Sequence, residues 1–303
     1  MDLMKLKCIF FCVILLNSFN AYALRLEGIY PIKNSEGLDL SGLVSCKGKL
    51  LTISDKDSDV IYNIDKDVNE YKVNIELKVD IPEIELQNYQ FPNNILYFLY
   101  NLFDSDNYDW EGITCDQSSI LLISERHTKL LSVEPGSAKW IDIDSKSIES
   151  TGLLNTYNAF IEGVTVDNRY YYLSIERQPR GVVRVDRKTA KIKANVFNDV
   201  HISARPSDIA GLTMWNDSLY MLSRNDEELC HMDKKTLTVI SCESFKDAAY
   251  TIKYESDEFG VVEGLAITNE YIYMIIDNNS MNIKGTSDNR SRLLVFYNEL
   301  PHL

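Results

Sequence analysis

The stretch Ile161-Glu162-Gly163-Val164-Thr165-Val166 is followed, thirteen residues after its glycine, by Glu176-Arg177. The same two-part phrase occurs five times, always with this offset of thirteen residues between the glycine and its partner. The pairs are Gly42 with Asp55, Gly112 with Glu125, Gly163 with Glu176, Gly211 with Arg224 and Gly264 with Asp277. A constant offset inside a unit of about 50 residues indicates a repeat fold.

Each unit has the composition of short β-strands. In the last unit, Leu265-Ala266-Ile267 is followed by the polar turn Thr268-Asn269-Glu270 and then by the run from Tyr271 to Ile276. Such β-branched and aromatic runs, separated by polar turns, are typical of strands. Four short strands in about 50 residues are the pattern of a β-propeller blade. We therefore predict an all-β fold, a β-propeller of five blades, with six blades as the alternative.

The two ends of the chain are predicted to meet in one blade. The last unit is one strand short, and the segment from Arg25 to Ile32 precedes the first unit. This N-terminal segment can supply the missing strand, which closes the ring and removes the exposed edges of an open array. The interval between Gly42 and Gly112 is the longest, and residues 92–103 within it have a helix-start signal and helical length. We expect a helical insertion there.

The first residues have the pattern of a secretory signal peptide. Lys5 and Lys7 precede a short apolar run, and Ala21-Tyr22-Ala23 is a small-x-small cleavage site,. The later sequence contains no run of about 20 apolar residues, the length that a membrane helix needs. We expect a signal peptide over residues 1–23 and one propeller domain over residues 24–303, periplasmic or secreted and not inserted in a membrane.

The charge and the cysteines narrow the possible partners and the compartment. The formal net charge is -14, without a basic cluster to offset it, so the surface repels nucleic acid and favours a cation,. An even number of cysteines after residue 23 permits two disulfides in an exported chain. Cys230 and Cys242 flank a polar turn, which favours a bridge across that hairpin. Cys46 and Cys115 form the second candidate pair; the alternative is four reduced, buried cysteines.

The repeated acids predict a metal site. Opposed residues of an antiparallel hairpin have a constant index sum, so the acid before each glycine and its partner return to the same end of the hairpin. Oxygen ligands without cysteine or clustered histidine suit a hard cation, Ca²⁺ before Mg²⁺. The predicted ligands are Glu111, Glu162, Glu263 and Asp277. The alternative is an architectural role, in which the glutamates bind backbone amides of the next blade.

In a propeller the innermost strands line a central channel, so these acids should gather at one mouth of that channel. Other residues at the same mouth are candidates for catalysis and substrate binding. Arg126 and Arg177 follow acidic partners, and Arg224 replaces one. We assign these arginines to an anionic substrate, with ion pairing inside the ring as the alternative, and we take Glu125 and Glu176 as candidate general bases. The sequence has no nucleophile elbow, phosphate-binding glycine loop or His-Glu-x-x-His motif,.

The motifs resemble a known family. The most specific stretches are Ile276-Asp277-Asn278-Asn279 and Arg292-Leu293-Leu294-Val295-Phe296, beside the repeated Glu-Gly pairs. They are similar to the phytase-like domain called esterase-like activity of phytase, and to the SdiA-regulated group of exported propellers. The resemblance implies a calcium-type site and a phosphoesterase or esterase activity. Its acidic positions fall on Glu111, Glu162, Glu176, Glu263 and Asp277. Ala210, Arg224 and Ser41 depart from the pattern.

These observations lead to one functional hypothesis and two alternatives. We expect an exported, calcium-binding propeller that hydrolyses a small anionic ester, a phosphate ester or a similar one, at the channel mouth, with the metal polarising the scissile group. The first alternative is a non-catalytic propeller that binds a small molecule or a protein partner. The second is a lactonase. We expect a monomer.

Overall fold

The structure is a computed structural model that describes residues 23–68, 70–84, 108–155, 160–197, 207–255 and 261–301. The predicted signal peptide lies outside the described residues except for Ala23, and the predicted helical insertion at 92–103 lies entirely outside them. No described helix has the length and apolar character of a membrane span.

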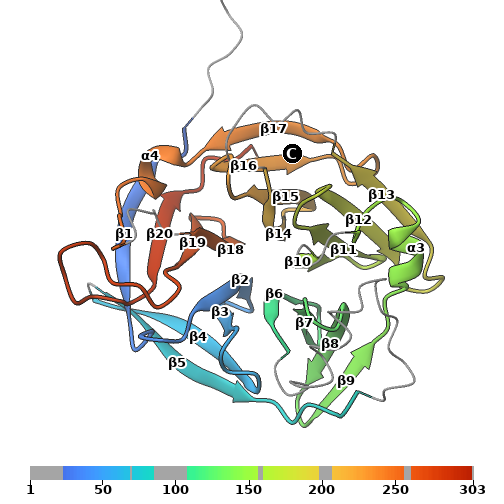
Figure 1. Cartoon of the computed structure of the whole chain (residues 1–303), viewed down its shortest axis with the longest axis horizontal. Coiled ribbons are helices and arrows are strands. Elements are labelled where there is room, and N and C mark those ends of the chain that lie inside the picture. Colours follow the sequence, from blue (N-terminus) through green and yellow to red (C-terminus); the bar gives the residue numbers. More distant parts are fainter. Residues whose placement is uncertain are drawn as a thin grey trace, which may run out of the picture.

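The described strands form four-stranded antiparallel units arranged around a central axis, which confirms the predicted β-propeller (Figure 1). Within the first four units, turn residues separate the strands, and each strand pairs with the next one along the chain. The first unit consists of β2 (Leu40–Cys46), β3 (Lys49–Ser54), β4 (Val60–Asp67) and β5 (Glu70–Lys78). The second consists of β6 (Trp110–Cys115), β7 (Ile120–Ser124), β8 (Lys129–Glu134) and β9 (Ser137–Ile141).

The third and fourth units repeat this order, and two short helices connect units. The third unit consists of β10 (Ile161–Val166), β11 (Tyr170–Ile175), β12 (Gly181–Asp186) and β13 (Ile192–Val196). The fourth consists of β14 (Ile209–Trp215), β15 (Ser218–Ser223), β16 (Glu228–Met232) and β17 (Val239–Ser244). Helix α3 (Ser145–Glu149) precedes the third unit, and α4 (Lys246–Ala249) follows the fourth.

The last unit joins the two ends of the chain. It consists of β18 (Val261–Ile267), β19 (Tyr271–Asp277), β20 (Arg292–Tyr297) and the N-terminal β1 (Leu26–Lys33). Strand β1 pairs antiparallel with β20, which confirms the predicted closure. A short parallel pairing of β1 with β5 links this unit to the first in one eight-stranded sheet. The described residues thus form five four-stranded units; the blade number of the whole chain stays a prediction.

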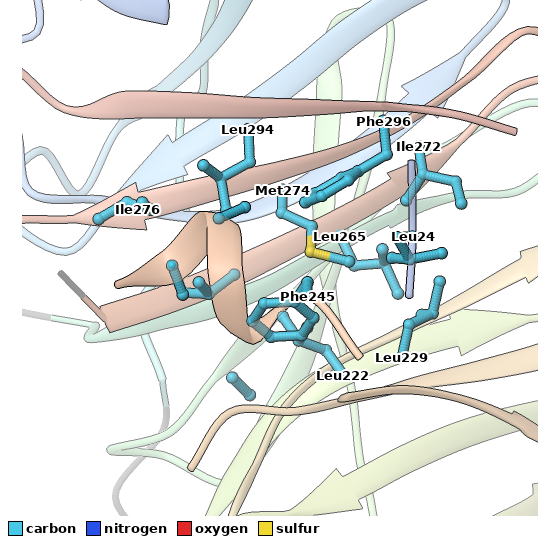
Figure 2. Close-up of a cluster of buried hydrophobic side chains, with 14 of the residues drawn as sticks. Leu24, Leu222, Leu229, Phe245, Leu265, Ile272, Met274, Ile276, Leu294 and Phe296 are labelled. Carbon is cyan, nitrogen blue, oxygen red and sulfur yellow. The ribbon is translucent and has the colours of Figure 1, made fainter. Parts of the chain in front are cut away.

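The hydrophobic core lies between neighbouring units. Each of the five buried clusters joins residues of two adjacent units. Figure 2 shows the cluster between the fourth and fifth units, where Leu222 and Phe245 lie opposite Met274 and Phe296. Apolar side chains on both faces of a strand are needed for this packing, which explains the nearly continuous apolar runs of the sequence.

Both predicted disulfides are present. Cys230 and Cys242 are directly opposed in the β16–β17 hairpin. Cys46 at the end of β2 bonds Cys115 at the end of β6, so it links the innermost strands of the first and second units. Disulfides form and persist in oxidising compartments.

Candidate functional site

Each innermost strand has a one-residue bulge beside the glycine of the repeat. In the third unit Ile161 pairs with Ile175 and Gly163 with Ser174, so Glu162 between them has no partner on β11. The equivalent bulges leave out Glu111, Ala210 and Glu263 in three other units, and Gly42 in the first. A bulge bends a strand and redirects a side chain, and bulges are common next to active sites.

The bulges place the glutamates beside a narrow cavity on the axis. The five glycines of the repeat line this cavity, together with Glu111, Glu162, Ala210 and Glu263. Its volume is about 10 Å³, enough for about one water molecule,. The axis is therefore nearly closed at the level of the glycines.

Five carboxylates gather at one side of this mouth. Asp109, Glu111 and Glu125 each offer an oxygen atom within 4.8 Å of the others, and so do Glu125, Glu162 and Glu176. Glu125 belongs to both groups and links the second unit to the third. Four of these residues are acids that the sequence assigned to the site; Asp109 is additional.

Burial and mutual repulsion raise the pKa values of these groups. Loss of hydration is the largest cause for Glu125, whose pKa is raised to about 8, followed by repulsion from Asp109 and Glu176. The pKa values of Glu111 and Glu162 are raised well above the usual range by burial and then by neighbouring carboxylates. Without a cation, part of this cluster therefore binds protons at neutral pH.

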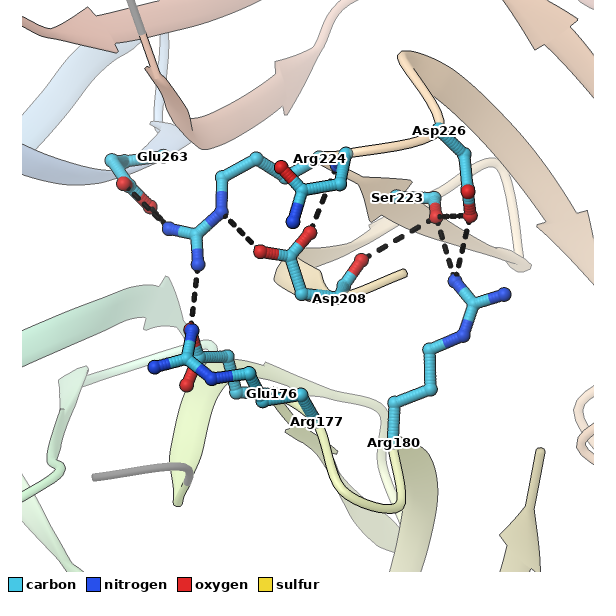
Figure 3. Close-up of polar contacts among 9 residues, drawn as sticks. Glu176, Arg177, Arg180, Asp208, Ser223, Arg224, Asp226 and Glu263 are labelled. Atoms are coloured by element: carbon cyan, nitrogen blue, oxygen red, sulfur yellow. Dashed lines mark hydrogen bonds and ion pairs between the residues drawn. The ribbon is translucent and has the colours of Figure 1, made fainter. Parts of the chain in front are cut away.

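Arg224 neutralises a second group of acids (Figure 3). Its Nη1 atom donates to both carboxylate oxygens of Glu263 at 2.6 Å, its Nη2 atom to Glu176 at 2.7 Å, and its Nε atom to Asp208 at 2.8 Å. The predicted ligand Glu263 is thus bound by the predicted substrate-binding residue Arg224. In this structure Arg224 therefore forms ion pairs inside the ring, which was the alternative prediction for the arginines.

A third group lies between the fifth and first units. Burial, followed by repulsion from Glu263 and from aspartates of the first unit, raises the pKa of Asp277 to about 7. The ammonium group of Lys56 lies 3.4 Å from Asp39 and 3.2 Å from Asp55. Asp277 itself accepts a hydrogen bond from the backbone N–H of Asn279 at 2.8 Å. Asp277 lies outside the two carboxylate groups that contain Glu125.

The other two predicted arginines lie at the start of the loops that follow β7 and β11. Arg177 forms an ion pair with Glu176, which also contacts Arg224. Arg126 is buried and directly follows Glu125. Burial raises the pKa of Glu176 to about 7, although both Arg224 and Arg177 lower it.

Sequence reasoning missed three aspartates of the mouth. Asp39, Asp109 and Asp208 each stand three residues before a repeat glycine. The backbone carbonyl at this position accepts a hydrogen bond from the residue thirteen after the glycine, for example from Glu125 N–H to Asp109 at 2.9 Å. An alignment of the units on their glycines would have shown the recurring aspartate.

The donor set around Glu125 suits Ca²⁺. Two oxygens bound to one Ca²⁺ at about 2.4 Å are at most about 4.8 Å apart, and the oxygens within each three-carboxylate group satisfy this limit. Glu162 is 6% exposed, no described residue lies within hydrogen-bond or ion-pair distance of its carboxylate, and Arg224 attracts this carboxylate from farther away. A hard cation would satisfy it.

The fold and the mouth together define a β-propeller with a carboxylate-lined opening on its axis. Residues 100–280 match the family described as SdiA-regulated, and the chain belongs to this family. None of the curated proteins searched matches the sequence.

Solved structures are similar in fold. The glutaminyl cyclase of Myxococcus xanthus has 13% identity, with 90% of this chain and 95% of that chain covered and a TM-score of 0.52. The nidogen/laminin complex has 11% identity, coverage of 84% and 82%, and a TM-score of 0.44. A structural genomics protein from Bacteroides thetaiotaomicron has 10% identity, coverage of 88% and 75%, and a TM-score of 0.44. At these identities the similarity concerns the fold alone.

Proposed function

We propose that this protein binds Ca²⁺ at the mouth through Glu125 and Glu162, with Glu111 in the neighbouring carboxylate group, and hydrolyses a small anionic ester there. Glu176 completes the group of Glu125 and Glu162, and Asp109 completes the group of Glu111 and Glu125. We further propose that the protein acts after export, in the periplasm or outside the cell, where its two disulfides are stable,.

The observation that carries the calcium proposal is the environment of Glu162. The residue Glu162 is 6% exposed, and a buried carboxylate is costly to ionise without a close partner,. Glu162 lines the axial cavity and lies within reach of Glu125 and Glu176. The described residues offer it no hydrogen-bond donor. One divalent cation would neutralise this carboxylate and its neighbours together.

The proposed ester hydrolysis assigns roles to the groups around the metal. When bound, the ion supplies polarisation of the ester's carbonyl or phosphoryl group. Glu176, with its pKa of about 7, is suited to accept a proton from an attacking water near neutral pH,. Arg126 and Arg177 would orient the anionic part of the substrate. Glu125 is the second candidate base and is here assigned mainly to the metal.

Calcium binding is tested by thermal unfolding of the chelator-treated mature chain. We expect added Ca²⁺ to stabilise the wild type, by about 2.7 kcal/mol at a hundredfold excess over Kd. Glu162→Gln should lose this stabilisation. Glu243→Gln is the matched control, because Glu243 lies on the outer strand β17 and should keep the full calcium response. A wild type that Ca²⁺ does not stabilise would contradict the proposal.

Hydrolysis needs its own assay. We expect calcium-dependent release of p-nitrophenol from a phosphate or carboxylate ester, with kcat lowered at least tenfold in Glu176→Gln. A lactone assayed in parallel separates the lactonase alternative. Calcium binding without turnover of any of these substrates would favour the non-catalytic alternative.

One observation favours a non-catalytic binding function. The guanidinium of Arg224 is occupied by three carboxylates, so it is not available to an anionic substrate. The mouth then recognises a ligand or a protein partner mainly through its bound cation. This reading predicts calcium-dependent stability without saturable hydrolysis.

A further inference from the structure

A cavity of about 350 Å³ lies between the first and second units. Strands β3 and β5 of the first unit and β7 and β8 of the second contribute to its lining (Figure 1). Small-molecule sites in proteins usually have volumes of about 300–1,000 Å³. The cavity therefore has room for a small organic molecule, whereas the axial cavity has room for about one water molecule,.

The turns that line this cavity lie at the ends of the hairpins opposite the mouth. Cys46 pairs with Lys49 at the far end of the β2–β3 hairpin, and Ser119 lies in the turn between β6 and β7. Glu111 lies at the start of β6, and Glu125 directly follows β7, so both stand at the other end of their hairpin. The cavity is thus separate from the carboxylates of the mouth.

Apolar side chains form much of the cavity wall. Leu51 and Val133 are buried, and Leu77 and Ile120 are partly buried; all four belong to the hydrophobic cluster between the first and second units. The wall is therefore a continuation of the core that has an open space beside it. Such a surface favours the apolar part of a ligand, because its burial removes apolar surface from water.

Covalent and polar contacts hold the wall in place. Cys46 lies in the wall, and its disulfide with Cys115 joins the innermost strands of the two units. The Nζ atom of Lys49 donates to both carboxylate oxygens of Glu76, at 2.6 and 2.8 Å, which links β3 to β5. A ligand that enters a preformed cavity loses little affinity to the ordering of the protein.

One cation at the cavity is available to a ligand. Of the four charged side chains in the lining, Lys49 and Glu76 bind each other, and Glu134 lies 3.9 Å from Lys139. The fourth is Lys47, which is exposed and forms no ion pair with any described residue. A single lysine matches a single negative charge, and the acidic protein surface disfavours a more highly charged anion.

We propose that this cavity is a second binding site, for a small molecule with an apolar body and one carboxylate group. The apolar body lies against Leu51, Ile120 and Val133, and the carboxylate forms an ion pair with Lys47. This site needs neither the calcium ion nor the hydrolysis that are proposed for the mouth.

The test is calorimetric titration at low salt with octanoate, and with octanamide as its uncharged counterpart. Wild type should bind one octanoate per chain, equally well with chelator and with Ca²⁺. Lys47→Gln should weaken octanoate binding about twofold to fivefold, the value of an exposed ion pair, and leave octanamide binding unchanged. Glu134→Gln should strengthen octanoate binding, because it removes a like charge. Lys253→Gln, an exposed lysine outside the lining, is the matched control.

Ser119→Trp places a large side chain in the cavity lining and should abolish the binding of both compounds. Unchanged octanoate binding in folded Ser119→Trp would overturn the proposal, as would octanoate binding that requires Ca²⁺, which would place the ligand at the mouth. Equal effects of Lys47→Gln on octanoate and octanamide would overturn the role of Lys47. If Ser119→Trp does not fold, the opposite responses of Lys47→Gln and Glu134→Gln decide. A wild type that binds neither compound at millimolar concentration contradicts the proposal.

Discussion

A Cβ atom placed on Gly163 would lie 2.9 Å from the Cα atom of Gly211 in the neighbouring unit. The innermost strands therefore approach one another too closely for a side chain at this point. We predict that Gly163→Ala lowers the free energy of unfolding by about 1–3 kcal/mol, the usual cost of overpacking. Urea unfolding at constant calcium concentration measures this change.

Gly211→Ala is the control within the same ring. A Cβ atom on Gly211 would meet no atom closer than 3.7 Å, an ordinary van der Waals contact. We expect a much smaller loss than in Gly163→Ala. Equal losses in the two variants would mean that a general preference for glycine, and not the contact between strands, sets the cost.

The metal-free protein should become less stable as the pH rises. Glu125, Glu176 and Asp277 have pKa values of about 8, 7 and 7, against about 4 in an unfolded chain. The folded chain binds these protons more tightly, so their stabilisation is complete below about pH 4 and is lost toward pH 8. Thermal unfolding in chelator should show Tm falling over this range. Added Ca²⁺ should reduce the fall.

Asp277→Asn isolates one contribution to this pH dependence. It removes a group that titrates near pH 7, so the decline of Tm between pH 5 and pH 8 should become shallower. Asp233→Asn serves as the control, because hydrogen bonds from Thr236 lower the pKa of Asp233. That variant should keep the wild-type slope. A steeper decline in Asp277→Asn would contradict the assignment.

The repeat was sufficient to predict the architecture. The constant offset between Gly163 and Glu176 corresponds to the length of a hairpin. The N-terminal segment from Arg25 to Ile32 was recognisable as the strand missing from the last unit. Hairpin length depends on neighbouring residues, and the number of strands can be counted along the sequence, so both can be predicted without knowing distances in space. The repeat also made Cys46 and Cys115 a candidate pair, because both residues stand just after a repeat glycine, and the structure contains this disulfide.

The contacts between side chains across the mouth could not be predicted in the same way. Whether Glu263 contacts a metal or Arg224 depends on which long side chains meet across the axis, and the sequence gives no distances between units. The three acidic partners of Arg224 come from three different units, so the sequence does not show that they meet. Arg224 was therefore assigned to a substrate. Asp109 and Asp208 were missed because only the glycine and its partner were compared between units.

The two disulfides should contribute unequally to stability. Loss of Cys46–Cys115 releases a loop with a sequence separation of 69, whereas Cys230–Cys242 spans 12 residues. The loss of chain entropy predicts costs of about 4 and about 3 kcal/mol for replacement of each pair by alanine. Urea unfolding of the two double variants measures both. A larger loss for the Cys230–Cys242 pair would contradict this order.

Closure of the ring depends on the N-terminal strand β1, and two positions of this strand can test it. Ile32 is 0% exposed and packs in the cluster between the fifth and first units, whereas Leu26 is 39% exposed on the same strand. We predict a loss of about 2–5 kcal/mol for Ile32→Ala and less than about 1 kcal/mol for Leu26→Ala. If unfolding in urea shows equal, small losses, β1 is only a peripheral addition. A large loss confined to Ile32→Ala would show that the first and last units are stabilised together, as a closed propeller requires.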